Sequence, residues 1–295
     1  MRKIGFIGLG AMGLPMAKNL LAQGHQVIGY DTALTAARDL ADAGGSIATD
    51  VASLVKAVDV CITMLPNGPI VLNVFERDIL PHANPAQVFI DCSTSGVPSA
   101  RRLHILAAEL GLSMLDAPVT GGVGGAQAGT LTFMVGGDEA VFASVREVLA
   151  AMGDKLVHAG GPSTGQAVKV CNNMAAGIIK IAISEAFILA KKLGVDDKVL
   201  FEVASAGSAQ SFALTKTCPV PGLVATSPSS REYQNGFATD LMLKDMVLAQ
   251  EAGMSAGAAT VLGAAATQLY QLCSSAGLGD KDNGIVYQYL LGKQA

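Results

Sequence analysis

Six residues near the start of the chain, Gly8 to Gly13, have the GxGxxG spacing that can bind a pyrophosphate. The apolar run before them, Lys3 to Ile7, predicts a buried parallel strand. Gly8 permits a tight turn, Gly10 lets backbone approach a phosphate, and Gly13 allows close packing of the next helix. The N-terminus of that helix favours negative charge. The predicted nucleotide-binding turn consists of Gly8, Leu9, Gly10, Ala11, Met12 and Gly13.

A carboxylate, Asp31, follows the second predicted strand, Gln26 to Tyr30. In this position an acidic residue accepts hydrogen bonds from an adenosine ribose, whereas a 2′-phosphate would meet like charge. No arginine stands beside it in residues 31–34. A lone GxGxxG is often only a turn, but here strand, turn, helix, strand and acid are all in place. The sequence therefore predicts NAD as the cofactor.

A second pair of residues, Lys169 and Asn173, could carry out proton transfer. They lie in a largely apolar helix predicted to run from Ser163 to Gly194. Their spacing puts them on one face, one turn apart, with Gly165 a turn before the lysine. Burial would lower the lysine pKa from its usual value of about 10.4, so that the amine could act as a base. A solvated surface lysine is the alternative, because most helical lysines are exposed.

Two further turns follow predicted buried strands, at residues 59–64 and 87–91. In a doubly wound sheet, ligands bind outside the carboxyl ends of the strands. These turns are therefore expected to join the glycine turn along one crevice, although an ordinary connection is an equal alternative for each. The residues concerned are Leu65, Pro66, Asn67 and Thr94.

Residues 117–130 contain the densest glycine segment and follow a short predicted strand, Met114 to Asp116. Glycine at this density costs backbone entropy. Successive exposed N–H groups in such a loop can bind an anion, and a small carboxylate would suit it. The strand-like run Leu131 to Val135 follows at once, which argues against a flexible linker.

The composition limits the possible partners of this 295-residue chain, which has a net charge of −4. Neither a basic patch nor a long like-charge run is present, so nucleic acid is not an expected partner. Residues 117–137 and 252–279 are uncharged, but their glycines and small polar residues make poor bilayer helices, so no membrane partner is expected.

The five cysteines and four histidines are scattered singly. This pattern is typical of a reducing compartment and predicts no metal site. The first predicted strand begins at Lys3, which leaves no room for a signal peptide. The expected location is the cytoplasm of a prokaryote, or the mitochondrial matrix if a removed transit peptide preceded this sequence.

Strands and helices alternate as far as a predicted strand at residues 155–158, and Gly160 to Pro162 then break the chain. Beyond them the pattern is helical, and Ser163 with Gln166 fits a capping box. The predicted fold is α/β, a Rossmann-type doubly wound sheet domain followed by an all-helical domain. We place the domains at residues 1–162 and 163–295.

Three motifs resemble those of the 3-hydroxyisobutyrate dehydrogenases, within the β-hydroxyacid dehydrogenase family. Residues 6–20 are similar to that family's N-terminal signature. Residues 116–122, DAPVTGG, resemble its substrate-binding DAPVSGG, with Thr120 keeping the hydroxyl of the usual serine. Gly165, Lys169 and Asn173 match its GxxxKxxxN. Residues 218–222, 233–237 and 279–282 are similar to the 3-hydroxyisobutyrate branch in particular.

The resemblance implies roles for these residues and an assembly. Lys169 would be the catalytic acid/base, and Lys244 would approach the cofactor. Residues 65–67 and Thr94 would contact the cofactor as well. The chain would form a homodimer or homotetramer. The implied substrate-binding residues are Thr120, Gly121, Gly122 and Asn173.

The leading functional hypothesis is NAD-dependent oxidation of 3-hydroxyisobutyrate to methylmalonate semialdehyde, a step of valine breakdown. Reduction of tartronate semialdehyde, or turnover of a related small β-hydroxyacid, is the alternative within this class. A nucleotide-sensing protein without turnover is a third reading. Lys169 argues against it, because a sensor needs no proton carrier.

Overall fold

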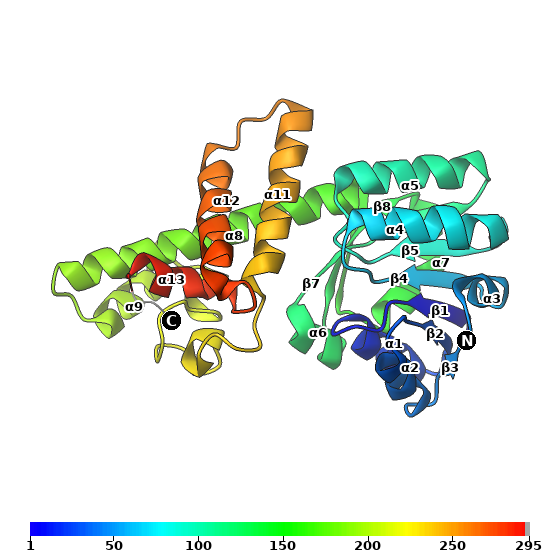
Figure 1. The fold of residues 1–295 in the computed structure, drawn as a ribbon, viewed down its shortest axis with the longest axis horizontal. Coiled ribbons are helices and arrows are strands. Elements are labelled where there is room, and N and C mark those ends of the chain that lie inside the picture. The colour runs from blue at the N-terminus through cyan, green and yellow to red at the C-terminus, as the bar shows by residue number, and fades with distance from the viewer. Residues whose placement is uncertain (293–295) are drawn as a thin grey trace. The chain divides into compact units, whose positions relative to one another are not determined.

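The computed structural model describes residues 1–292. Figure 1 shows the fold of the chain. Internal contacts divide the chain into two units, with the division between Lys169 and Val170. This point lies inside one continuous helix, α8 (Thr164–Lys192), which therefore contributes to both units. Each unit is described below by itself.

The first unit is built on one sheet in which six parallel strands have the order β3-β2-β1-β4-β5-β6. This strand order is that of the Rossmann fold, with a reversal of direction between β1 and β4. The parallel strands are β1 (Lys3–Ile7), β2 (Gln26–Tyr30), β3 (Ser46–Ile47), β4 (Val60–Thr63), β5 (Val88–Asp91) and β6 (Ser113–Asp116). The sheet continues with β8 (Thr132–Gly137), antiparallel to β6, flanked by β7 (Val119–Thr120) and β9 (Lys155–Gly160).

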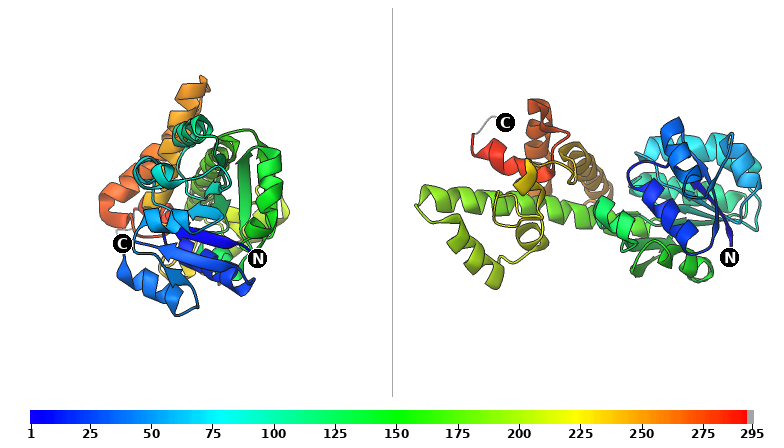
Figure 2. Two further views of the ribbon diagram at one scale, coloured as in Figure 1. Left: turned by 90° about the vertical axis from the view of Figure 1, so that its right-hand side faces the viewer. Right: turned by 90° about the horizontal axis from the view of Figure 1, so that it is seen from below.

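Helices cover both faces of this sheet (Figures 1 and 2). Successive residues of a strand point to opposite faces, so a central strand needs apolar residues throughout. In β4, Ile62 belongs to the core on one face and Cys61 to the core on the other. The helices of this unit, before α8, are α1 (Gly13–Ala22), α2 (Leu34–Ala41), α3 (Val51–Lys56), α4 (Gly68–Val74), α5 (Val97–Glu109), α6 (Gly122–Ala128) and α7 (Glu139–Ala150).

The second unit is helical as far as residue 292, apart from an isolated bridge between Ala238 and Asp282. One of its cores surrounds Tyr270, whose hydroxyl donates to the carbonyl of Gly177 at 3.0 Å. The α/β fold with an all-helical second part is thus confirmed. The helices after α8 are α9 (Asp197–Ala206), α10 (Phe212–Thr215), α11 (Thr239–Ala256), α12 (Val261–Cys273) and α13 (Val286–Leu290).

Helix α8 is the one helix within residues 1–292 that is long and apolar enough to cross a membrane, by length and composition only. Core helices of soluble proteins pass the same test, and the buried polar residues of α8 have partners within the chain. Lys180, for example, donates to the carbonyl and the hydroxyl of Thr217.

The glycine-rich segment is not the open loop that its composition predicts. Thr120 pairs with Thr132 in the sheet, and the segment then forms helix α6. Gly121 and Gly122 have φ values of +133° and +64°, so the turn between strand and helix needs residues without a Cβ. The glycines here form the turn between β7 and α6. The exposed N–H groups are those at the start of α6, whereas the sequence predicted an irregular anion-binding loop.

Candidate active site

The glycine turn after β1 has the shape that a pyrophosphate requires. Gly8 has φ +95°, and a Cβ on it would collide with the carbonyl of Met64. A Cβ on Gly13 would collide with the carbonyl of Gly8, whereas Gly10 faces open space. No side chain caps the first turn of α1. The turn therefore fits an anion held by backbone N–H groups.

The other three residues of the turn differ in exposure. Leu9 is buried in the core of the sheet, Met12 packs partly against that core, and Ala11 is exposed. Any contact of Leu9 with a cofactor would therefore be made by its backbone.

The carboxylate of Asp31 connects the end of β2 to this turn. Its Oδ2 accepts from the N–H of Leu9 at 2.6 Å, and its Oδ1 accepts from the N–H of Ala33 at 2.7 Å. These two hydrogen bonds fix the carboxylate beside the glycine turn, where an adenosine ribose would lie. Asp31 is only half-buried, so it stays accessible, and the residues fit NAD.

The turns after β4 and β5 adjoin the glycine turn. Leu65 donates its N–H to the hydroxyl of Ser93 at 2.8 Å, and the carbonyl of the residue before it lies against Gly8. Pro66 is exposed and Thr94 is half-buried. The side chain of Asn67 caps α4 by accepting from the N–H of Ile70 at 3.0 Å. Its side chain thus has a structural role, which the sequence alone did not reveal.

The lysine of the GxxxKxxxN motif contacts the DAPVTGG segment. Lys169 is 7% exposed, and its Nζ donates to the carbonyl of Val119 at 2.7 Å. Gly165 makes this approach possible, because a Cβ there would lie 2.5 Å from the carbonyl oxygen of Asp116. Thr120 is half-buried beside this contact, and Gly121 and Gly122 are exposed. Two motifs fifty residues apart are therefore joined within the first unit.

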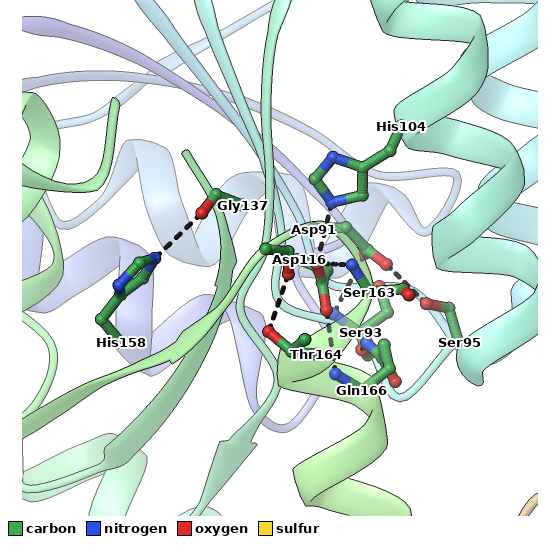
Figure 3. A network of polar contacts seen from close by, with 11 residues as sticks. Asp91, Ser93, Ser95, His104, Asp116, Gly137, His158, Ser163, Thr164 and Gln166 are labelled. Atoms are coloured by element: carbon green, nitrogen blue, oxygen red, sulfur yellow. Dashed lines mark hydrogen bonds and ion pairs between the residues drawn. The ribbon is translucent and has the colours of Figure 1, made fainter. Parts of the chain in front are cut away.

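The capping box expected at Ser163 is wrong. Ser163 has φ +68°, and the first turn of α8 is held by the carboxylate of Asp116 (Figure 3). Its Oδ1 accepts from the N–H of Ser163 and its Oδ2 from the N–H of Gln166, each at 2.9 Å. The Gln166 amide donates to the carbonyl of Ser93 at 2.7 Å and accepts from the N–H of Gly96 at 3.1 Å. Sequence reasoning missed the roles of Asp116 and Gln166, whose only signal was their place inside the motifs.

In the second unit, Asn173 and Lys244 meet at one carboxylate. Asn173 is buried, and its Nδ2 donates to Oδ2 of Asp245 at 2.5 Å. The Nζ of Lys244 lies 3.5 Å from the other carboxylate oxygen. Asp245 therefore fixes the amide of Asn173, which lies one turn after Lys169 along α8.

A Rossmann-type domain with an acid after its second strand, followed by a helical domain, is typical of NAD-dependent oxidoreductases. Two family profiles agree with this class. Residues 3–161 match the NAD binding domain of 6-phosphogluconate dehydrogenase. Residues 163–290 match the family described as NAD-binding of NADP-dependent 3-hydroxyisobutyrate dehydrogenase.

Relatives cover nearly the whole chain. A probable 3-hydroxyisobutyrate dehydrogenase of Mycobacterium tuberculosis is 47% identical over 92% of both chains. An NAD-dependent L-serine dehydrogenase of Pseudomonas aeruginosa is 42% identical over 97% of both. A mitochondrial 3-hydroxyisobutyrate dehydrogenase of Homo sapiens is 39% identical over 97% of this chain and 86% of its own length. This chain belongs to the 3-hydroxyisobutyrate dehydrogenase family of NAD-dependent hydroxyacid oxidoreductases.

The solved structures agree with the sequence relatives. A structure titled Mycobacterium tuberculosis 3-hydroxyisobutyrate dehydrogenase + L-serine has a TM-score of 0.95 and 45% identity. It covers 98% of this chain and 99% of its own.

Proposed function

We propose that this protein oxidises 3-hydroxyisobutyrate to methylmalonate semialdehyde with NAD, as a step of valine catabolism. The contact between Lys169 and the carbonyl of Val119 carries the proposal. It supports the proposal because the buried amine of Lys169 contacts the DAPVTGG segment, whose Thr120, Gly121 and Gly122 would bind a carboxylate. A hydroxyacid offers both a hydroxyl and a carboxylate to such a pair.

In the proposed reaction each residue has one task. When bound, NAD supplies the acceptor for the hydride that leaves C3 of the substrate. Lys169, as the neutral amine, accepts the proton of the C3 hydroxyl, and in the reverse direction its ammonium returns that proton. The carbonyl of Val119 orients the amine by accepting a hydrogen bond from Nζ. Asn173 would hold the substrate without titrating. The carboxylate of the substrate would be bound by Thr120, Gly121 and Gly122.

The cofactor contacts proposed here follow the arrangement of the turns. The glycine turn and Asp31 would hold the pyrophosphate and the ribose, and residues 65–67 with Thr94 would border the same crevice. We also propose Lys244, which is paired with Asp245, as a cofactor contact.

L-serine is the second candidate substrate, because one relative is named an L-serine dehydrogenase and a solved structure carries L-serine in its title. Both compounds have a hydroxymethyl group and a carboxylate on the same carbon. They differ in a methyl group against an ammonium group at that carbon. Tartronate semialdehyde, reduced to glycerate, is a further member of this class.

A substrate panel decides among these candidates. Initial rates of NADH formation would be measured with both enantiomers of 3-hydroxyisobutyrate, with L-serine and with glycerate, using NAD and NADP in parallel. We expect the kcat/KM for one enantiomer of 3-hydroxyisobutyrate to exceed that for L-serine by at least ~10-fold, because removing an ammonium group from water is costly. An L-serine value as high or higher would reassign the substrate. Absence of turnover with every hydroxyacid would favour a sensor.

We also propose that the protein assembles as a homodimer or homotetramer. The helical unit exposes large apolar side chains that include Leu193, Val203, Met254 and Val261. Burying them against a second copy would be favourable. Light scattering should give a mass two or four times the 30.0 kDa of the chain, and a monomer mass would contradict the proposal.

For location we propose the cytoplasm in a prokaryote and the mitochondrial matrix in a eukaryote, which expression of a tagged chain would test.

A further inference from the structure

The carboxylate of Asp116 takes the place of a helix cap at the start of α8. The first N–H groups of a helix have no partners within the helix, and an acidic group there also complements the helix dipole. Asp116 is fully buried at the end of β6 and accepts from two of these groups, one on each oxygen. The cap thus comes from a strand that lies about fifty residues away in sequence.

A histidine holds this carboxylate from the other side. His104 of α5 places Nε2 at 2.8 Å from Oδ1 of Asp116 (Figure 3). Because a carboxylate only accepts, Nε2 is the donor. Two glycines make room for the arrangement: a Cβ on Gly136 would lie 2.6 Å from Oδ1, and one on Gly165 would lie 2.9 Å from Oδ2. The surroundings of Asp116 are therefore shaped to bring its carboxylate onto the backbone of α8.

The same residue is connected to Lys169 by two routes. Through its carboxylate, Asp116 fixes Gln166, which lies one turn before Lys169 on α8. Through the chain, it lies three residues before Val119, whose carbonyl accepts from Nζ of Lys169. Asp116 thus fixes both the helix that carries the amine and the segment that orients it.

We propose that Asp116, supported by His104, is a positioning residue for Lys169. The inference rests on the proposed function, in which Lys169 exchanges the proton of the substrate hydroxyl. Asp116 is fully buried, so it would act without touching substrate or cofactor. Its effect on the reaction comes from the placement of the amine, and a displacement of about 1 Å at a reacting group can reduce the rate ~10²-fold.

The first experiment replaces Asp116 by asparagine in the full-length enzyme. In Asp116→Asn one oxygen becomes an amide that cannot accept, so one of the N–H groups at the start of α8 loses its partner. We expect kcat to fall between ~10-fold and ~10²-fold. The Kd for NAD, measured by fluorescence titration, should stay within about twofold. Unchanged kcat in the folded variant would overturn the inference.

Asp138 provides a matched control in the same unit. Its side chain caps α7 by accepting from the N–H groups of Ala140 and Val141 at 2.9 and 3.0 Å. Asp138→Ala removes the acceptor of both bonds on a helix that carries no proposed catalytic residue. Its kcat should equal that of the wild type, and a loss as large as that of Asp116→Asn would show that any damaged cap impairs turnover.

A double-mutant cycle separates positioning from a general structural role. In the Lys169→Ala background the amine is absent, so Asp116→Asn should reduce the residual rate by less than about twofold. Two losses that multiply would overturn the inference. If Lys169→Ala itself keeps near-normal turnover, the proposed function fails instead. A full loss in Lys169→Ala with normal kcat in Asp116→Asn would reject the positioning role alone.

His104 keeps the inference testable if Asp116→Asn does not fold. His104→Leu removes the donor to Oδ1, whereas His104→Gln keeps an N–H donor at that position. We expect kcat to fall several-fold in His104→Leu, with unchanged Kd for NAD and with most of the lost rate restored in His104→Gln. Wild-type kcat in His104→Leu, or an equal loss in both variants, would overturn the role given to His104. It would also overturn the inference that a carboxylate held by His104 positions Lys169.

Discussion

Single residues on α8 show how two buried lysines can differ in surroundings. Lys169 donates to a carbonyl of the DAPVTGG segment, whereas Lys180 donates to the carbonyl and hydroxyl of Thr217 in the helical unit. Burial lowers the pKa of Lys180, although the charge of Asp282 opposes the effect. Burial alone therefore does not identify a catalytic lysine, and the neighbouring segment is what distinguishes Lys169.

The Lys169→Ala variant should lose at least ~10²-fold in kcat, because a positioned acid/base contributes about that factor or more. NAD binding should persist, since the glycine turn and Asp31 are unaffected. Steady-state kinetics and NAD titration would measure both quantities. For the wild type, the rate of alcohol oxidation should rise with pH, because the base is the neutral amine.

The control for this variant is Lys180→Met, which removes the other buried lysine of the same helix. Its kcat per folded molecule should match that of the wild type, although its stability can change. Near-normal turnover in Lys169→Ala would assign the proton transfer to another group.

Asp31 should set the preference between the two nicotinamide cofactors. Its carboxylate is held beside the glycine turn by two backbone N–H groups, so it cannot easily move away from a 2′-phosphate. We expect kcat/KM to favour NAD over NADP by at least ~10²-fold, which corresponds to about 2.7 kcal/mol. Asp31→Ser should narrow that ratio.

Asp59 is a suitable comparison for the cofactor measurement. It also accepts from a backbone N–H, that of Lys3 at 3.0 Å, but it lies at the opposite end of the strands. Asp59→Ser should keep the wild-type ratio. Comparable kcat/KM values for both cofactors in the wild type would show that Asp31 does not select between them.

At the scale of elements, the strand-to-helix turn from β7 to α6 is the proposed carboxylate site. N–H groups that point at a carboxylate form charge-assisted hydrogen bonds about twice as strong as neutral ones. Gly122 is exposed, has φ +64° and opens α6, so a valine there would distort the turn and cover its N–H groups. Gly122→Val should raise the KM for the hydroxyacid by ~10-fold or more, about 1.4 kcal/mol, and leave the Kd for NAD nearly unchanged.

Gly124, two residues further on in α6, is the matched position. A Cβ there would meet no atom within 4 Å, and its φ is not positive. Gly124→Val should change the KM of the hydroxyacid much less. Equal loss of NAD affinity in Gly122→Val would assign this turn to the cofactor.

At the scale of the whole molecule, Asp91 should shape the pH dependence of stability. Burial raises the pKa of this carboxyl at the end of β5 above its usual 3.8, although hydrogen bonds from Ser93, Ser95 and Thr63 oppose the rise. The folded protein therefore binds this proton more tightly than the unfolded chain does. Its contribution to the free energy of unfolding falls as pH rises from about 4 through the folded pKa.

The Asp91→Asn variant lacks this titration. Its urea midpoint relative to wild type should increase with pH above about 4. Asp50 has the opposite sign, because the hydrogen bond from the N–H of Ser53 lowers its pKa. The midpoint of Asp50→Asn relative to wild type should therefore decrease as pH rises toward about 4 and stay level above it. Parallel pH profiles for both variants would contradict the assignment.

The sequence by itself determined the features that depend on local chemistry. Glycine spacing, apolar runs and the carboxylate after the second strand specify a nucleotide-binding sheet, because each depends on a few adjacent residues. The strand at residues 26–30 and the helix that carries Lys169 were predicted close to their observed bounds. The glycine-rich segment was predicted to be an irregular loop, whereas it forms the end of β7 and helix α6.

Only the tertiary structure decided which distant groups meet. The cap of α8 comes from Asp116 and not from Ser163, and the lysine contacts the carbonyl of Val119. Asn67 accepts from a helix N–H group and Asp245 accepts from the amide of Asn173, and sequence spacing could identify neither partner. These contacts join residues whose separation along the chain carries no periodic signal. They depend on the register of β6 beside β5 and on glycines whose missing Cβ atoms allow α8 to approach the sheet.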